Sequence, residues 1–174
     1  VIIQVGHIER LNPALLALKK YDIHPTFLEI QRLAPYTSRG SDVPVVLDKM
    51  IHDIDILLSV VKSDVYSLDA VGMSIITNSL DIAQARRKFK NGTVASLMAS
   101  RIAQSDVRKI QLFQRNLYST IDLLKGSTEI YKVEENTRSK SDILKSAEFQ
   151  RNGQKSFINY MKPKLQKHDA LELE

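Results

Sequence analysis

The spacing of apolar residues changes along the chain and separates helical segments from strands. Between residues 44 and 62 the apolar side chains recur every three or four positions, as on one face of a helix. A shorter helix is predicted over 13–20, because Asn12 can cap its first amides and Pro13 is tolerated in a first turn. The period falls toward two in the predicted strands, which cover 1–8, 25–32, 65–77, 81–90, 93–102, 108–113, 117–123 and 127–133.

The order of these segments predicts the fold class. Two helices alternate with the first strands, and a run of strands follows in which Asn91-Gly92 is a strong hairpin signal. We therefore expect one α+β domain over 1–174, with an open, mostly antiparallel sheet and helices on one face. The polar stretch 134–153 receives no strand and is expected to be an excursion that is mobile or packed across a partner.

The other sheet face is expected to be covered as well. Segments 71–77 and 95–101 carry apolar residues on both sides, more than a solvent-facing sheet needs. Burial against a second subunit is the simplest account, so we expect a homo-oligomer through the sheet face.

Composition narrows the cellular setting. The chain has no cysteine, no signal-peptide pattern and no apolar run near the roughly 20 residues that cross a bilayer, which favours the cytoplasm and no membrane partner. It begins at Val1 and stops at Glu174 within a helix-like pattern, so we expect a fragment of a longer polypeptide.

The net charge of +5 and the pI near 9.4 raise the question of nucleic-acid binding. Basic residues are interleaved with acidic ones, aromatic residues are few and tryptophan is absent. A binding groove needs a continuous basic track and stacking side chains. A solvated surface of mixed charge is therefore favoured, and no nucleic-acid partner is expected.

The candidate chemistry lies in the longer helix. At about 100° per residue, Asp48, His52 and Asp55 share one narrow stripe. On spacing alone, a polar helix face with an Asp–His pair is favoured over a site. A zinc site is disfavoured because the remaining histidines occur in unrelated segments. An acid/base role also fits, since histidine titrates near neutral pH and a carboxylate can fix its tautomer.

Three segments in order carry a family resemblance over roughly residues 1–133. They are Gly6-His-Ile-Glu-Arg-Leu-Asn-Pro-Ala14, Arg32-Leu-Ala-Pro35 and Asp48-Lys-Met-Ile-His-Asp-Ile-Asp55. They resemble the C-terminal half of the Gfo/Idh/MocA oxidoreductases, in which Asp-x-x-x-His is the characteristic element. The first segment looks most like the nucleotide-sugar branch, which oxidises C3 of UDP-N-acetyl-hexosamines or their uronates.

The resemblance implies specific roles. His52 would be the acid/base on the hydroxyl being oxidised, and Asp48 would bind or polarise the sugar. Asp55 would orient the helix and is also a candidate substrate-binding residue. Arg10, Asn12 and Arg32 are further candidates near the cleft, but no motif supports them and a structural role is equally open. NAD or NADP would be bound by an N-terminal Rossmann domain, which carries a Glu-Lys-Pro lysine.

The sequence departs from the whole-family pattern. It contains neither Gly-x-Gly-x-x-Gly nor Glu-Lys-Pro, so no cofactor-binding residue is expected here and this chain alone is predicted to be inactive. Two hypotheses stay open. One is the substrate-binding and oligomerisation domain of an NAD(P)-dependent sugar dehydrogenase. The other is a binding or dimerisation module in which Asp48 and His52 are vestigial.

Overall fold

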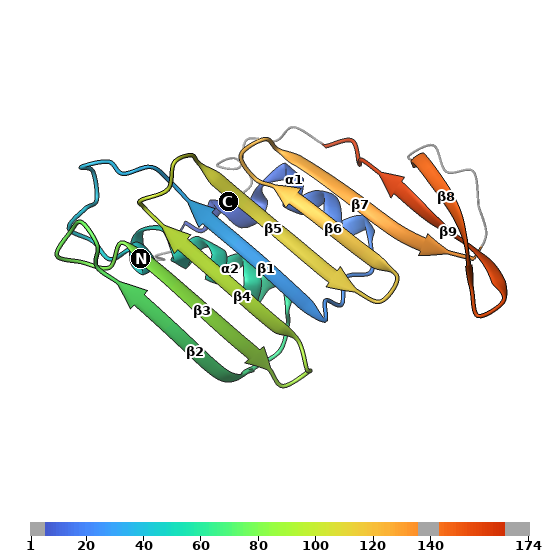
Figure 1. The fold of residues 1–174 in the computed structure, drawn as a ribbon, viewed down its shortest axis with the longest axis horizontal. Coiled ribbons are helices and arrows are strands. Elements are labelled where there is room, and N and C mark those ends of the chain that lie inside the picture. The colour runs from blue at the N-terminus through green and yellow to red at the C-terminus, as the bar shows by residue number, and fades with distance from the viewer. Residues whose placement is uncertain (1–5, 136–142, 166–174) are drawn as a thin grey trace, which may run out of the picture.

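The computed structural model describes residues 6–135 and 143–165 and consists of one wide sheet with short helices on one face (Figure 1). The helical elements are η1 (Ile8–Leu11), α1 (Pro13–Leu16), η2 (Ala17–Lys20), η3 (Val46–Met50) and α2 (Ile51–Val60). The strands are β1 (Phe27–Leu33), β2 (Val65–Met73), β3 (Ile82–Phe89), β4 (Val94–Ser100), β5 (Val107–Gln114), β6 (Leu117–Asp122), β7 (Ser127–Glu134), β8 (Ile143–Arg151) and β9 (Gln154–Met161).

The nine strands form a single sheet in the order β2-β3-β4-β1-β5-β6-β7-β9-β8. Only β1 and β4 pair in parallel, and the other neighbours are antiparallel. The predicted fold class, an α+β domain with an open and mostly antiparallel sheet, is confirmed. No helix in these described ranges is both long and apolar enough to cross a membrane.

The core lies between the sheet and the helices. Alternate side chains of the central strands, such as Leu28, Ile30 and Leu97, point to the helix side and are almost fully buried. Ala14 of α1 and Leu57 of α2 pack onto them in one apolar cluster. This alternation follows from the pleat of a strand, which sends successive side chains to opposite faces.

Several predicted boundaries change in the structure. Of the strand predicted over 1–8, residues 1–5 lie outside the described ranges, and Ile8 begins η1 instead. The helix predicted over 13–20 is α-helical only to Leu16 and continues as a 3₁₀ turn. The strand predicted over 65–77 ends at Met73, because the next residues turn around the carboxylate of Asp81.

The polar stretch 134–153 is not an excursion from the sheet over its described C-terminal part. Residues 143–151 form β8, the edge strand, which pairs with β9. Asn152 and Gly153 connect the two strands with φ of 52° and 77°, the positive values that a tight hairpin turn requires. This Asn-Gly pair is the same kind of signal as Asn91-Gly92 of the β3–β4 hairpin, but the prediction for this stretch rested on its polar composition alone.

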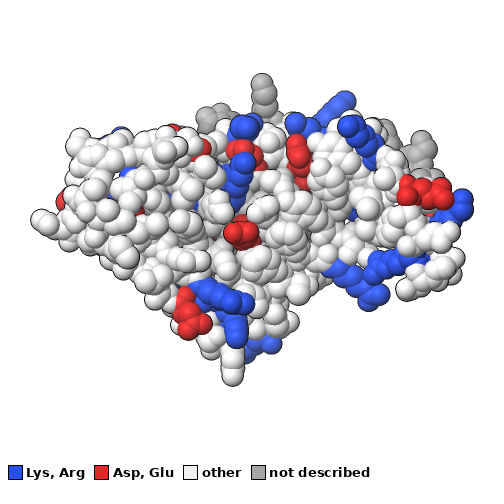
Figure 2. Space-filling model, viewed as in Figure 1, with Lys and Arg blue, Asp and Glu red and all other residues white. Residues whose placement is uncertain are grey.

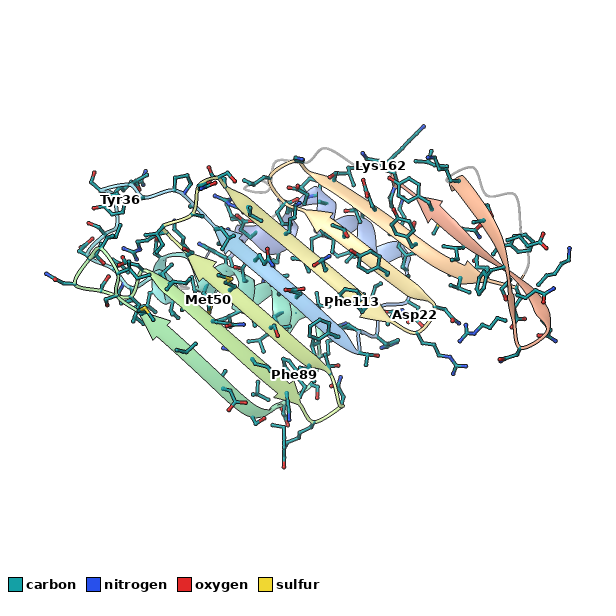
Figure 3. The ribbon with its side chains drawn as sticks, viewed as in Figure 1. Asp22, Tyr36, Met50, Phe89, Phe113 and Lys162 are labelled. Carbon is teal, nitrogen blue, oxygen red and sulfur yellow. The ribbon has the colours of Figure 1, made fainter. Side chains whose placement is uncertain are left out.

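The sheet face opposite the helices carries an aromatic row, defined as Phe27, Phe113, Tyr118, Tyr131 and Tyr160. These side chains belong to β1, β5, β6, β7 and β9 and follow one another with ring centroids 4.9–5.8 Å apart. Phe113 is labelled in Figure 3, and Figure 2 shows wide uncharged areas on this face on both sides of a few central charged groups. The row forms because register places each ring directly opposite the next.

Candidate functional site

The candidate site surrounds His52, the second residue of α2. The chain just before η1 brings His7 against it, with the ring centroids 6.3 Å apart and the ring planes 78° apart. The Nδ1 atoms of both imidazoles are buried, and neither has a hydrogen-bond partner among the described residues. Two partly exposed imidazoles therefore meet at this site, and only His52 was selected from the sequence.

An ion cluster with a buried centre supports the two imidazoles; it consists of the buried Arg32 and Asp53 and the partly exposed Glu9 and Arg108. The Nε atom of Arg32 donates to both carboxylate oxygens of Asp53 at 3.0 Å, and its Nη2 donates to Oδ1 at 2.8 Å. Its Nη1 donates to Oε1 of Glu9 at 3.3 Å, and Arg108 donates to the same oxygen at 2.9 Å. The cluster thus joins η1, β1, α2 and β5 around the helix that carries His52.

The sequence explains why the centre of this cluster is buried. Arg32 continues the inward-facing series of Leu28 and Ile30 on β1, so the strand period directs it into the core. Asp53 lies on the buried side of α2 with Ile56 and Leu57. Arg32 is 4% exposed and Asp53 is 2% exposed. An acid and a base at apolar positions of neighbouring elements are the signal that would have identified this pair.

Burial and these charges set the ionisation of the site. Burial lowers the pKa of His52, and the positive charge of Arg32 lowers it further. Burial raises the pKa of Asp53 even though Arg32 opposes this change. The pKa of Arg32 is raised because its hydrogen bonds with Asp53 and the nearby negative charges outweigh burial. His52 is therefore biased toward the neutral imidazole, the form that accepts a proton.

Asp48 occupies a different environment from the one its spacing suggested. It lies in η3, a π-helical turn, so the count of 100° per residue does not carry from Asp48 across to His52. Its carboxylate is 3.2 Å from the Nζ atom of Lys49 and is partly exposed. The charged groups that act on His52 are instead Arg32, Glu9 and Asp53, with His7.

The other predicted substrate-binding residues make protein contacts. Arg10 forms an ion pair with Asp55, which ties η1 to the middle of α2. Asn12 accepts from the amide of Ala14 at 3.0 Å, which confirms its predicted capping role, and donates to the carbonyl of Leu123 at 3.2 Å. Arg32 belongs to the ion cluster. These contacts give all four residues a part in assembling the site.

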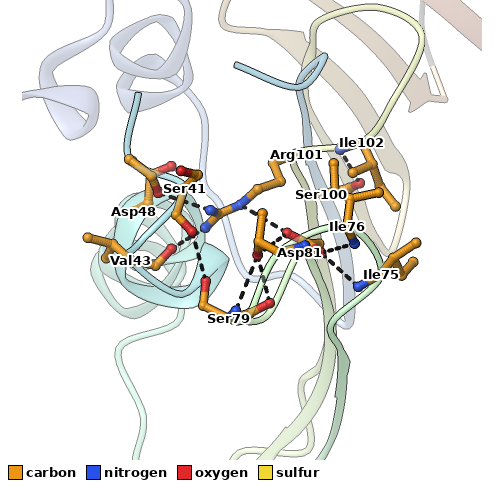
Figure 4. A network of polar contacts seen from close by, with 12 residues as sticks. Ser41, Val43, Asp48, Ile75, Ile76, Ser79, Asp81, Ser100, Arg101 and Ile102 are labelled. Atoms are coloured by element: carbon orange, nitrogen blue, oxygen red, sulfur yellow. Dashed lines mark hydrogen bonds and ion pairs between the residues drawn. The ribbon is translucent and has the colours of Figure 1, made fainter. Parts of the chain in front are cut away.

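A second polar network fixes the loop that leads into η3 (Figure 4). The carboxylate of Asp81 accepts from the amides of Ile75 and Ile76 at 2.7 Å and from that of Thr77 at 3.0 Å. Arg101 lies 3.9 Å from this carboxylate and donates to the carbonyls of Gly40 and Val43. The network therefore joins the β2–β3 turn to the segment that precedes Asp48.

A large groove of the described structure lies away from His52. Its volume is about 890 Å³, and its walls include Leu15, Ile23 and Val61 with Lys19 and Lys62 nearby. It opens at the last turn of α2, about 12 Å along the helix from His52 at 1.5 Å per residue. The volume of this groove does not make it the candidate site, because His52, with its lowered pKa, lies at the opposite end of α2 together with the ion cluster.

The described residues do not fit a dinucleotide or a metal ion. A dinucleotide site needs a strand, a glycine-rich turn and a helix, and the segment from β1 to η3 contains the single glycine Gly40. Within the described ranges, no three His, Asp or Glu side chains are placed to share a cation. We therefore assign no cofactor contact to this chain.

Comparison with known proteins identifies the lineage. No protein-family model matches the chain. It is 36% identical over 132 residues to UDP-N-acetylglucosamine 3-dehydrogenase of Acidithiobacillus ferrooxidans, a match that covers 75% of this chain and 42% of that protein. A solved structure of that dehydrogenase superposes with a TM-score of 0.81 at 31% identity, covering 100% of this chain and 51% of the other. The chain is a homologue of the Gfo/Idh/MocA oxidoreductases.

The wider Gfo/Idh/MocA group has the same fold. Levoglucosan dehydrogenase in complex with NADH gives a TM-score of 0.66 at 17% identity, covering 76% of this chain and 43% of that one. A dehydrogenase from Clostridium difficile gives 0.63 at 18% identity, covering 74% and 42%. The chain spans about half the length of the relatives it matches. The resemblance inferred from three short segments, including its nucleotide-sugar branch, is confirmed.

Proposed function

We propose that this chain is the substrate-binding and catalytic half of an NAD(P)-dependent dehydrogenase that oxidises a sugar hydroxyl of a nucleotide sugar. The observation that carries the proposal is the 36% identity to UDP-N-acetylglucosamine 3-dehydrogenase. We propose C3 of a UDP-N-acetyl-hexosamine as the position oxidised. The cysteine-free composition supports a cytoplasmic location.

The reaction divides into a hydride transfer and a proton transfer. Oxidation of a secondary alcohol to a ketone removes a hydride from carbon and a proton from oxygen, and an NAD(P)⁺ held outside this chain would supply the hydride acceptor. His52 accepts the hydroxyl proton. Its lowered pKa keeps the imidazole neutral near pH 7, and Nε2 is the ring nitrogen left to meet a ligand because Nδ1 is buried.

The surrounding residues divide between substrate contact and support. Asp48 has a partly exposed carboxylate near the start of the same helix, which suits a hydrogen bond to a sugar hydroxyl. Arg32 is sealed from solvent by Asp53 and Glu9, so its role is to hold α2 in place. The Arg10–Asp55 ion pair and the cap by Asn12 set the positions of η1 and α1 beside α2.

The direct test is an assay of the full-length protein that contains this chain. Reduction of NAD⁺ or NADP⁺ at 340 nm is followed with UDP-N-acetylglucosamine, and free N-acetylglucosamine and levoglucosan serve as comparison substrates. We expect turnover with the nucleotide sugar and a 3-keto product by mass spectrometry. The proposal would be contradicted if none of these sugars were oxidised with either NAD⁺ or NADP⁺.

Substitution of His52 tests the assignment of the base. In the full-length protein, His52→Ala should reduce kcat by about 10²–10⁴-fold, the usual contribution of a positioned acid/base. His24→Ala is a matched control, because His24 is an exposed histidine paired with Asp22 at the far groove. Near-full activity of His52→Ala would assign the proton transfer to another group.

The open sheet face supports a second element of the proposal, a homo-oligomer. The aromatic row and the uncharged areas beside it suit burial against a second copy of the chain. The same observation favours the alternative function, a binding or dimerisation module without activity. The assay above separates the two, because only the dehydrogenase reduces the dinucleotide.

A further inference from the structure

His7 is a titratable group that the proposed reaction does not use. It comes from the segment before η1 and lies against His52, with the two ring centroids 6.3 Å apart. The nearly perpendicular ring planes place the edge of one imidazole toward the face of the other. The pair therefore consists of two groups of the same chemistry on separate elements.

The buried nitrogens of the pair are complementary. Nδ1 is the buried atom of both rings, and neither atom has a hydrogen-bond partner among the described residues. Buried polar atoms are satisfied in native proteins, often by an ordered water. A neutral imidazole carries one N–H and one lone pair, so one ring can donate to a shared water molecule and the other can accept from it.

The charges around the pair limit how many protons it can hold. Glu9 of η1 and Asp53 of α2 are matched by Arg32 of β1 and Arg108 of β5. The nearby Asp55 is paired with Arg10, and Asp48 is paired with Lys49. No carboxylate of the ion cluster is left over to neutralise positive charge on the two rings, which favours passing a proton on over storing it.

Building on the proposed function, we propose that His7 is the proton relay partner of His52. His52 takes the hydroxyl proton at Nε2 and gives up its Nδ1 proton to a water molecule between the rings. That water passes a proton to Nδ1 of His7, and His7 releases its Nε2 proton to solvent. Each imidazole gains one proton and loses one, and a shift of tautomer completes the cycle.

The kinetic test compares two substitutions of His7 in the full-length protein. His7→Phe keeps a ring and removes both nitrogens, and we expect kcat to fall about 10-fold, less than the loss from removing a direct base, with KM little changed. In His7→Ala, added imidazole should restore kcat, whereas pyrazole, an equally small ring that is weakly basic, should not. Equal restoration by both rings would show that His7 only fills space and would overturn the relay.

A second test requires no enzyme activity. The chain contains four histidines, so labelling histidine with ¹³C at Cε1 allows His52 to be followed by NMR. We expect the apparent pKa of His52 to rise in His7→Phe but not in His24→Phe, because His7 is among the groups that lower it. An unchanged His52 titration in His7→Phe would overturn the pair. The same rise in His7→Phe of a protein without dehydrogenase activity would retain the pair and reject the proposed function.

Discussion

At the scale of single residues, the Arg32–Asp53 pair is the most constrained feature of the site. Both side chains are buried, and three hydrogen bonds of 2.8–3.0 Å join them. A buried ion pair stabilises little by itself, but removal of one partner leaves an uncompensated charge. The pair therefore controls whether α2 can hold His52 against the sheet.

Removal of the guanidinium should destabilise the fold strongly. We expect Arg32→Met to lower the free energy of unfolding by about 3–5 kcal/mol, because Asp53 would remain charged in an apolar setting. The double variant with Asp53→Leu should recover much of this loss, while Glu9 keeps Arg108. Urea unfolding measures both, and Arg115→Met, at an exposed position, is the control. A double variant as unstable as Arg32→Met would contradict this account.

The lowered pKa of His52 predicts a pH dependence. The neutral base is the active form, so kcat/KM of the full-length protein should fall as the pH drops through a value below the ordinary 6.5 of histidine. Burial and Arg32 lower this pKa, while Glu9 and Asp53 raise it. Glu9→Gln should therefore shift the acidic limb to lower pH. A shift to higher pH would reverse the assigned electrostatics.

At the scale of elements, the β2–β3 turn and the loop before η3 behave as one unit. Asp81 gathers three backbone amides of the turn, and Arg101 connects it to the carbonyls of Gly40 and Val43. Burial raises the pKa of Asp81, but the hydroxyl of Thr77 and the backbone amides outweigh it and hold the pKa well below its usual range. The ionised carboxylate of Asp81 therefore helps to hold in place the segment that precedes Asp48.

This network predicts acid sensitivity. Because the folded-state pKa of Asp81 is depressed, its stabilisation is present above the ordinary value of 3.8 and is lost as the pH falls below it. Asp81→Asn should lower the urea midpoint at pH 7 and reduce the further decline of the midpoint in acid. Asp69→Asn, on the exposed edge strand β2, is the matched control. An identical acid decline in Asp81→Asn and the unsubstituted chain would contradict the role of this carboxylate.

At the scale of the whole molecule, the two sheet faces differ in what covers them. The helix face is closed by α1, α2 and their flanking turns, whereas the opposite face presents the aromatic row (Figures 1 and 3). A row of partly exposed aromatic side chains is typical of an interface core. The sheet thus carries the candidate site on one face, and the described helices leave its other face uncovered.

A charge in the middle of the aromatic row should disrupt assembly. We expect Tyr118→Glu to convert a dimer or larger oligomer to monomer, because burial of a carboxylate between two sheets costs more than the contact provides. Leu58→Glu is the control, since Leu58 is an exposed apolar residue of α2 on the helix side. Sedimentation velocity measures both variants. A monomeric unsubstituted chain at high concentration would reject the proposed interface.

The fold class, most strands and the helix that carries His52 could be predicted from the amino-acid sequence. These features depend on local periodicity, and signals such as Asn91-Gly92 act over a few residues. Three short segments also sufficed for the family. The edge strand β8 was missed because its polar, exposed pattern resembles a loop, although Asn152-Gly153 marked its hairpin.

Which charged side chains pair with one another depends on the three-dimensional packing of the elements. Glu9, Arg32, Asp53 and Arg108 come from four elements, and their pairing depends on how those elements pack. The π-helical turn η3 changes the rotation per residue, so the stripe predicted for Asp48 and His52 on an ideal α-helix does not hold. His7 reached His52 across 45 residues of sequence, a contact that no local period encodes. Periodicity fixes the direction in which a side chain points from its own element, whereas the ionisation of a site depends on neighbours from other elements.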